Sequence, residues 1–172
     1  MRLMPWLIIP LAALSSMALP AAGEEATITL PERKAGLWEL KTQMDEGNGP
    51  QDQIMKLCVD GQMEKNTVLA SIADHKANCT AYDVKASGGD TIVDSDCLYN
   101  GRKVMSTTNM SGDFKSAFKI TIQSTTTEPE QKEQSVVVKR TITQLGKFVG
   151  DSCGELKPGE AEAADGTRVL VQ

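Results

Sequence analysis

Apolar and polar residues alternate along much of the chain, which is the pattern of half-buried β-strands. In residues 36–44 the apolar side chains of Trp38, Leu40 and Met44 fall on one face, and charged or polar residues occupy the positions between them. The segment 53–59 is a second short run of this kind. We therefore expect the polypeptide to enter its fold through two β-strands.

The same alternation returns five more times after residue 79. These predicted strands are separated by glycine-rich or charged turn signals, the clearest of which is Asn100-Gly101, since the tightest hairpin turns need a positive φ at both central residues. The five segments are 80–85, 91–99, 103–109, 115–126 and 135–145. Short sequential connections predict that neighbouring strands pair antiparallel.

One segment, 60–74, changes character and predicts a short helix. Asp60 is suited to cap its first turn, and four apolar residues fall roughly on one side: Met63, Leu69, Ile72 and Ala73. His75 follows it and is interpreted as a solvated residue at the helix end. The predicted fold class is mainly β: a curled antiparallel meander or half-barrel of about seven strands with one short helix and two disulfides.

Both ends of the sequence differ from this central β domain, which we expect over residues 24–153. Residues 1–23 combine a positive start, a short apolar core and small residues before Glu24, which is typical of a secretory signal peptide cleaved after Gly23. The apolar stretch is too short and too proline-broken for a membrane anchor. Residues 154–172 are acidic and predict a flexible tail. The mature chain is expected in the periplasm, or secreted, without a membrane span.

The four cysteines, Cys58, Cys79, Cys97 and Cys153, are interpreted as two disulfides. An even number of cysteines in an exported chain favours disulfide bonds. A zinc site would need clustered pairs, and the spacings of 21, 18 and 56 residues provide none. A catalytic cysteine acting with His75 is the other alternative, but no neighbouring group orients that histidine.

Four cysteines allow three pairings, and the sequence leaves them open. A hairpin centred on Gly88 would place Cys79 opposite Cys97, with Ala81 facing Ser95, and would leave Cys58 to pair with Cys153. The main competitor joins the first cysteine to the second and the third to the fourth. We favour the first arrangement.

The composition and charge of the chain exclude several classes of ligand and active site. The chain has 172 residues, 18 Lys and Arg against 23 Asp and Glu, a net charge of -5 and a single histidine. The acidic balance argues against nucleic acid binding, and one histidine excludes a multi-histidine metal centre. No glycine-rich phosphate loop is present. Together with the single histidine, this leads us to expect no cofactor and no resident metal, and we assign no catalytic residues. Three acidic residues near one hairpin, Asp90, Asp94 and Asp96, are candidates for a calcium site but are interpreted as solvated.

Several short motifs occur in a characteristic order. They are Arg33-Lys34-Ala35-Gly36-Leu37-Trp38-Glu39, Cys58-Val59-Asp60, Asn78-Cys79, Asp96-Cys97, Ser111-Gly112-Asp113-Phe114 and Gly150-Asp151-Ser152-Cys153. This order resembles the bacterial domain of unknown function 3617 family over residues 32–153. The resemblance implies an exported, four-cysteine, mostly β protein, and it supplies no catalytic residues.

The chain departs from this family pattern at two places. The predicted helix begins with Asp60-Gly61 where members usually show Thr-Pro-Glu, and Ser152 adds a residue before the last cysteine. The second departure bears on how Cys153 meets its partner.

The function expected from these features is a non-catalytic binding or envelope-associated module. Its concave sheet face would hold an apolar small molecule or a segment of an envelope protein, in a cavity lined by residues such as Trp38, Leu40 and Phe118. The alternative is a periplasmic enzyme with hydrolase-like activity, which should show converging polar groups with perturbed pKa values in a cleft. A third option is a homo-oligomer formed by pairing of sheet edges.

Overall fold

The computed structural model describes residues 29–128 and 136–171. The predicted signal peptide, residues 1–23, lies outside these residues. Within the described ranges the chain forms nine strands and one helix, and no helix there combines the length and the apolar character needed to cross a bilayer. The mainly β fold class with one helix is confirmed.

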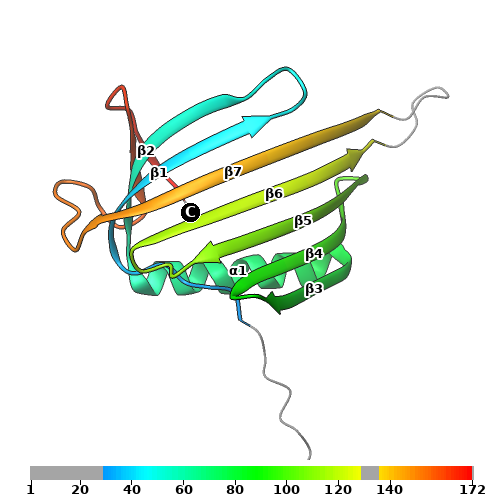
Figure 1. Cartoon of the computed structure of the whole chain (residues 1–172), viewed down its shortest axis with the longest axis horizontal. Coiled ribbons are helices and arrows are strands. Elements are labelled where there is room, and N and C mark those ends of the chain that lie inside the picture. Colours follow the sequence, from blue (N-terminus) through cyan, green and yellow to red (C-terminus); the bar gives the residue numbers. More distant parts are fainter. Residues whose placement is uncertain (1–28, 129–135, 172) are drawn as a thin grey trace, which may run out of the picture.

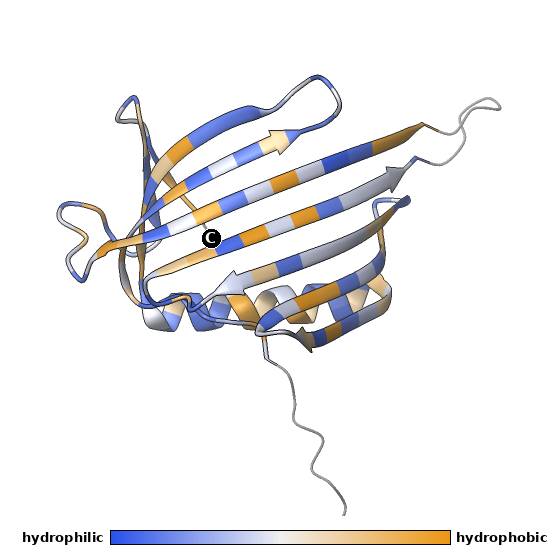
Figure 2. Cartoon of the chain, viewed as in Figure 1, coloured by the Kyte–Doolittle hydropathy of each residue, from blue (hydrophilic) through white to orange (hydrophobic). Residues whose placement is uncertain are grey.

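All nine strands belong to one antiparallel sheet, in the order β3-β4-β5-β6-β7-β1-β2-β8-β9. The strands and the helix are β1 (Gly36–Asp45), β2 (Gln51–Val59), α1 (Gly61–Asn78), β3 (Cys79–Ser87), β4 (Asp90–Tyr99), β5 (Arg102–Gly112), β6 (Ala117–Thr127), β7 (Val137–Gly150), β8 (Glu160–Ala163) and β9 (Arg168–Leu170). Seven of these strands correspond to the predicted ones. Figure 2 shows hydrophobic and hydrophilic bands alternating along them.

The connection between β2 and β3 departs from a simple meander. The strands β3 to β7 follow one another in space, but β7 then pairs with β1, and β2 lies on the far side of β1. The chain must therefore cross from one side of the sheet to the other between β2 and β3, and α1 makes this crossing (Figure 1). The sheet curls, and the helix runs along its open side.

The core lies on the concave face of the sheet around Trp38. This side chain is fully buried, and its ring centroid lies 5.3 Å from that of Phe118 and 5.5 Å from that of Phe148. Phe114 stacks on Phe118 with centroids 5.0 Å apart. The indole Nε1–H donates to the carbonyl of Lys34 at 2.7 Å, which satisfies its polar atom inside the core.

The predicted hairpin signals are confirmed at two turns. Asn100 and Gly101 have φ values of 52° and 78°, and Gly88 and Gly89 have values of 61° and 94°. Only residues that tolerate the left-handed region make such tight two-residue turns at low cost. The turns fix the pairing of β3 with β4 and of β4 with β5.

The predicted register of the β3–β4 hairpin is wrong by one residue. Ala81 faces Asp96 rather than Ser95, because the two-residue turn is centred between Gly88 and Gly89. An irregularity between Cys79 and Ala81 then shifts the register, so that Cys79 still faces Cys97.

Both disulfides are formed. Cys58 bonds to Cys153 across 95 residues of sequence, and Cys79 bonds to Cys97 across 18. This is the arrangement that the sequence favoured. Cys58 comes two residues before the helix cap Asp60, and Cys79 directly follows the helix, so the two covalent links flank α1 at its two ends.

The helix is longer than predicted and presents a different face to the protein. Asp60 caps it as expected, accepting from the backbone N–H groups of Gln62 and Met63 at 3.0 Å each. It ends at Asn78, so His75 lies in its last turn rather than beyond it. Leu69, expected on the inner side, is 56% exposed.

The prediction of a flexible tail after Cys153 is wrong. Residues of β8 pair with β2, β9 pairs with β8, and Ala161 is fully buried in the core against Leu57. The backbone N–H of Val171 also donates to the carbonyl of Gly159 at 2.8 Å. The segment adds to the sheet because the backbone N–H and C=O groups at the free edge of β2 pair with its own backbone. The composition of a segment does not reveal this kind of pairing.

Candidate ligand-binding site

A cleft of about 220 Å³ lies between the concave face of the sheet and α1. We call it the inner cleft. Its lining is mainly apolar and comes from the N-terminal lead-in, the helix, three strands and the turn between β5 and β6. The lining residues are Leu30, Pro31, Arg33, Glu64, Thr67, Val68, Ser71, Met110, Phe114, Phe118, Ile120 and Gln144. The cleft therefore forms where the helix crosses the sheet without packing closely against it.

The floor of the inner cleft is built by strand register. Met110 of β5 faces Ile120 of β6, which in turn faces Gln144 of β7. Directly paired residues of antiparallel neighbours point to the same face of a sheet, so these three side chains share the concave face. Phe118, two residues before Ile120, joins this floor to the core around Trp38. One wall of the cleft is thus formed by hydrogen-bonded strands of the sheet.

The charged part of the inner cleft is a neutralised pair. The guanidinium of Arg33 donates to both carboxylate oxygens of Glu64 at 2.8 and 2.7 Å, and the backbone N–H of Arg33 donates to the same carboxylate at 3.0 Å. Glu64 is only 4% exposed. A buried carboxylate needs such a partner, and here the pairing fixes the lead-in carrying Leu30 and Pro31 against the helix.

The helix supplies the roof of the inner cleft through Glu64, Val68 and Ser71, which share a face at the i, i+4, i+7 spacing. Near the C-terminal end of α1, the Nδ1–H of His75 donates to the carbonyl of Ser71 at 2.6 Å, a hydrogen bond within the helix. The His75 ring also lies 4.7 Å from the ring of Tyr82 on β3. The interpretation of His75 as a solvated residue therefore misses its contact with the sheet.

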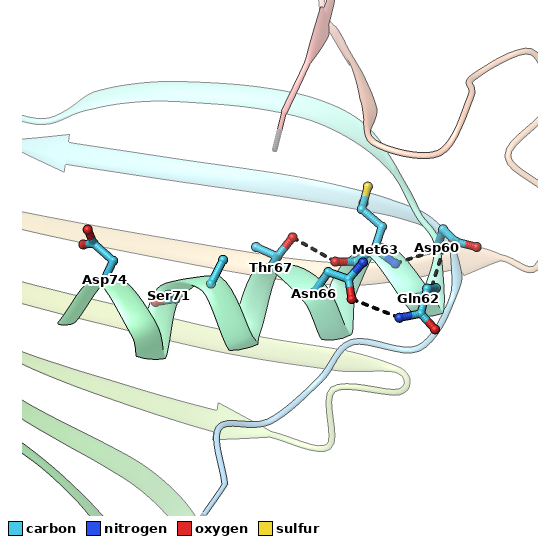
Figure 3. A pocket seen from close by; sticks show the side chains of 8 residues that line it. Asp60, Gln62, Met63, Asn66, Thr67, Ser71 and Asp74 are labelled. Carbon is cyan, nitrogen blue, oxygen red and sulfur yellow. Dashed lines mark hydrogen bonds between the residues drawn. The ribbon is translucent and has the colours of Figure 1, made fainter. Parts of the chain in front are cut away.

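A second hollow, of about 790 Å³, follows the flank of α1 (Figure 3). We call it the outer groove. It is lined by Asp60, Gln62, Met63, Asn66, Thr67, Ala70, Ser71 and Asp74. Figure 3 shows Met63, Thr67 and Asp74 projecting to the same side of the helix. Thr67 and Ser71 line both the outer groove and the inner cleft, so the two hollows adjoin at these residues.

The two carboxylates of the outer groove already have partners. Asp60 caps the helix, and Asp74 accepts from the hydroxyl of Tyr99 at 3.0 Å and from the amide of Asn78 at 2.9 Å. Burial, together with the nearby Asp74 carboxylate, raises the pKa of Tyr99. Lysine and arginine do not occur among the described residues that line the groove.

Two aspartates with lowered pKa values, Asp113 and Asp94, do not line the inner cleft. Hydrogen bonds from the backbone and hydroxyl of Ser116 and from two further backbone N–H groups hold the pKa of Asp113 well below its usual range, and this carboxylate organises the turn before β6. The pKa of Asp94 is lowered by the hydroxyl of Thr107 and by Lys85, on the outer face of β4. Each of these shifts follows from hydrogen bonds and, for Asp94, the nearby Lys85.

The acidic residues considered for a calcium site have separate partners. Besides the contacts of Asp94, Asp96 pairs with Lys103 at 3.0 Å, and Asp90 accepts from the amide of Asn109 at 3.2 Å. Across residues 29–128 and 136–171, no group of three or more His, Cys, Asp or Glu residues is placed to hold a metal ion.

The structure separates the three predicted ligand-face residues. Trp38 and Leu40 are 0% and 3% exposed and belong to the packed core, whereas Phe118 belongs to the core and also lines the inner cleft. Sequence reasoning missed the Arg33–Glu64 pair, because the two residues are 31 positions apart. The helical spacing of Glu64, Val68 and Ser71 indicates that these three residues share a face of the helix, but it does not connect Glu64 with Arg33.

Comparison with known proteins identifies a family but no activity. A family model described as a protein of unknown function (DUF3617) matches residues 33–153. This range begins at Arg33 of the buried ion pair and ends at Cys153, and it includes all of β1 to β7 and α1. Searches of curated proteins and of solved structures give no significant match.

Proposed function

Because the chain belongs to the domain of unknown function 3617 family, whose name carries no activity, we propose its function from the inner cleft. We propose a non-catalytic binding module that holds an apolar group of a small molecule between the sheet and α1. The observation that carries this proposal is a mainly apolar cleft between the sheet and the helix, in which the charged residues among the described lining, Arg33 and Glu64, neutralise each other.

The size of the inner cleft favours a small molecule over a protein segment. Ligand sites usually have volumes of about 300–1,000 Å³. At about 220 Å³ the inner cleft falls below that range, so it accommodates only part of a ligand and is too small for several residues of a partner chain. An apolar group of a small molecule is the occupant that fits its volume and lining.

We further propose that the protein works in the bacterial periplasm or outside the cell. Two disulfides support this location, since such bonds persist in oxidising compartments. The predicted signal peptide agrees with it. Mass spectrometry of the periplasmic protein should show a chain starting near Glu24 with no free thiols. Cytosolic protein that retains Met1 and reduced cysteines would contradict the proposal.

The binding proposal is tested by filling the inner cleft. Val68→Phe adds a ring to the roof of the cleft, and Leu69→Phe adds the same ring at the next position, which is 56% exposed. The neutral dye N-phenyl-1-naphthylamine, whose fluorescence rises in apolar surroundings, serves as the probe. We expect saturable binding by the unmodified protein and by Leu69→Phe, and at least tenfold weaker binding, about 1.4 kcal/mol, by Val68→Phe.

A third variant guards against a folding defect. Val68→Ala enlarges the cleft without adding bulk, so it should bind the dye at least as well as the unmodified protein. Circular dichroism and urea unfolding check that each variant is folded. Absence of saturable binding by the unmodified protein, or equal binding by folded Val68→Phe, would overturn the proposed function.

A further inference from the structure

The inner cleft is lined mainly by apolar residues and the outer groove mainly by polar ones, so together they suit an amphiphile. This inference rests on the proposed function. The two hollows adjoin at Thr67 and Ser71, one turn apart on α1. On one side of this junction the lining is dominated by apolar side chains such as Phe118 and Ile120. On the other side the helix offers amide, hydroxyl and carboxylate groups. A ligand that reaches both spaces needs an apolar end and a polar end.

The volumes support a ligand divided between the two spaces. The inner cleft, about 220 Å³, is smaller than an ordinary ligand site, whereas the outer groove, about 790 Å³, is within the usual range. The apolar end is the smaller and more enclosed part, and the larger head group remains in the more open groove.

The charges around the groove exclude an anionic head. The described groove residues carry two carboxylates, Asp60 and Asp74, and no ammonium or guanidinium group. In the inner cleft, the guanidinium of Arg33 is already bound by both oxygens of Glu64. A phosphate, sulfate or carboxylate head would therefore lie near two negative charges without a cationic partner.

The free hydrogen-bonding groups favour an uncharged head. Asp60 Oδ1 accepts from the helix cap, and Asp74 accepts from Tyr99 and Asn78, so much of the hydrogen-bonding capacity of the two carboxylates is already used within the protein, although both keep their negative charge. The Gln62 amide donates to the Asn66 carbonyl oxygen at 2.9 Å, which leaves the Gln62 carbonyl to accept and the Asn66 amide to donate. Neighbouring donors and acceptors of this kind match hydroxyl or amide groups.

The Thr67 hydroxyl adds a further acceptor at the junction of the two hollows. It donates to the carbonyl of Met63 at 2.9 Å, and its lone pairs stay available. From these contacts we infer that the ligand is an amphiphile whose apolar tail occupies the inner cleft and whose uncharged, hydroxyl- or amide-bearing head lies in the outer groove, bound by Gln62, Asn66 and Thr67.

The inference is tested with three amphiphiles that share an octyl tail: octyl glucoside, octyl sulfate and octyltrimethylammonium. Each is titrated, below its micelle-forming concentration, against protein loaded with N-phenyl-1-naphthylamine. We expect octyl glucoside to displace half of the dye at a concentration at least tenfold lower than either charged compound. Equal or better displacement by octyl sulfate or by octyltrimethylammonium would overturn the assignment of an uncharged head.

A charge substitution locates the head group. Asn66→Lys introduces a cation into the groove and should lower the concentration of octyl sulfate needed for displacement at least fivefold. Leu69→Lys introduces the same charge at an exposed position that does not line the groove, and it should leave the ranking unchanged. An equal response of the two variants would place the head outside the groove.

The two proposals fail in different ways. If the dye binds and Val68→Phe weakens it, but the three amphiphiles displace it equally, the inner cleft remains a binding site and only the head-group inference is lost. If the dye does not bind saturably, the proposed function fails and this inference fails with it.

Discussion

Gly146 shows how one residue sets the shape of the concave face. It lies on β7 between Leu40 of β1 and Phe118 of β6. A Cβ placed on Gly146 would come within 2.1 Å of the Phe118 ring. The missing side chain lets this ring lie across β7, where it contacts Trp38 and Phe114 and forms part of the cleft floor. The same ring thus links the core to the inner cleft.

We predict that Gly146→Ala lowers the free energy of unfolding by about 1–3 kcal/mol, because the added methyl group overpacks the Phe118 ring. Urea unfolding followed by tryptophan fluorescence measures the loss. Gly150→Ala is the matched control, since a Cβ there meets no atom within 4 Å. Adding Phe118→Leu to Gly146→Ala should recover part of the loss. A Gly146→Ala protein as stable as the control would contradict this account of the packing.

At the scale of single elements, the existence of α1 could be predicted from the sequence, but the face that it turns toward the sheet could not. Asp60 gave a local capping signal that the structure confirms. The inner face, however, contains a buried carboxylate, Glu64, while Leu69 points to solvent. A helix packed on a sheet needs an apolar stripe. A helix that spans a cleft and is tied at both ends does not, so hydrophobic periodicity gives the wrong face.

The β3–β4 hairpin separates what local sequence encodes from what the fold adds. The two glycines at its turn were readable as a turn signal, and they place Ser87 opposite Asp90. Continued without a break, this register would leave Cys79 one position away from Cys97. The irregularity before Ala81 corrects the offset, and the covalent bond between the cysteines requires that correction. No residue pattern in this strand announces it.

The strands β8 and β9 were missed for a different reason. Their segments are short, and the sequence Glu-Ala-Glu-Ala has weak strand propensity. They form because β2 offers a free backbone edge and because Ala161 is small enough to pack against Leu57. The inner cleft was beyond sequence reasoning in the same way, since Leu30, Glu64 and Gln144 meet only after the sheet has curled and the helix has crossed it.

At the scale of the whole molecule, the two disulfides together fix both ends of the helix that crosses the sheet. The strand order places β2 and β3 on different sides of the sheet, and α1 spans the distance between them. Cys58 ties the start of this crossing to the segment after β7, and Cys79 ties its end to β4. Because both ends are fixed covalently, α1 keeps its position above the sheet even though it leaves a cleft beneath it.

The two links should differ in their effect on stability. In the chain-entropy description, a crosslink that closes a longer loop restricts the unfolded chain more strongly. The Cys58–Cys153 bond closes a loop of 95 residues. We predict that replacing both cysteines by alanine lowers the free energy of unfolding by about 4–5 kcal/mol. The same change at Cys79 and Cys97, a loop of 18 residues, should cost about 3 kcal/mol.

Urea unfolding of the two double variants, side by side and without reductant, measures this difference. The comparison is matched, because each pair contains one cysteine that is 3% exposed, Cys58 or Cys97, and one that is half-buried. Loss of similar buried surface therefore contributes similarly to both variants, and loop length remains the main variable. If the variant without the short link were the less stable one, the links would act through native contacts at the ends of α1 rather than through the unfolded chain.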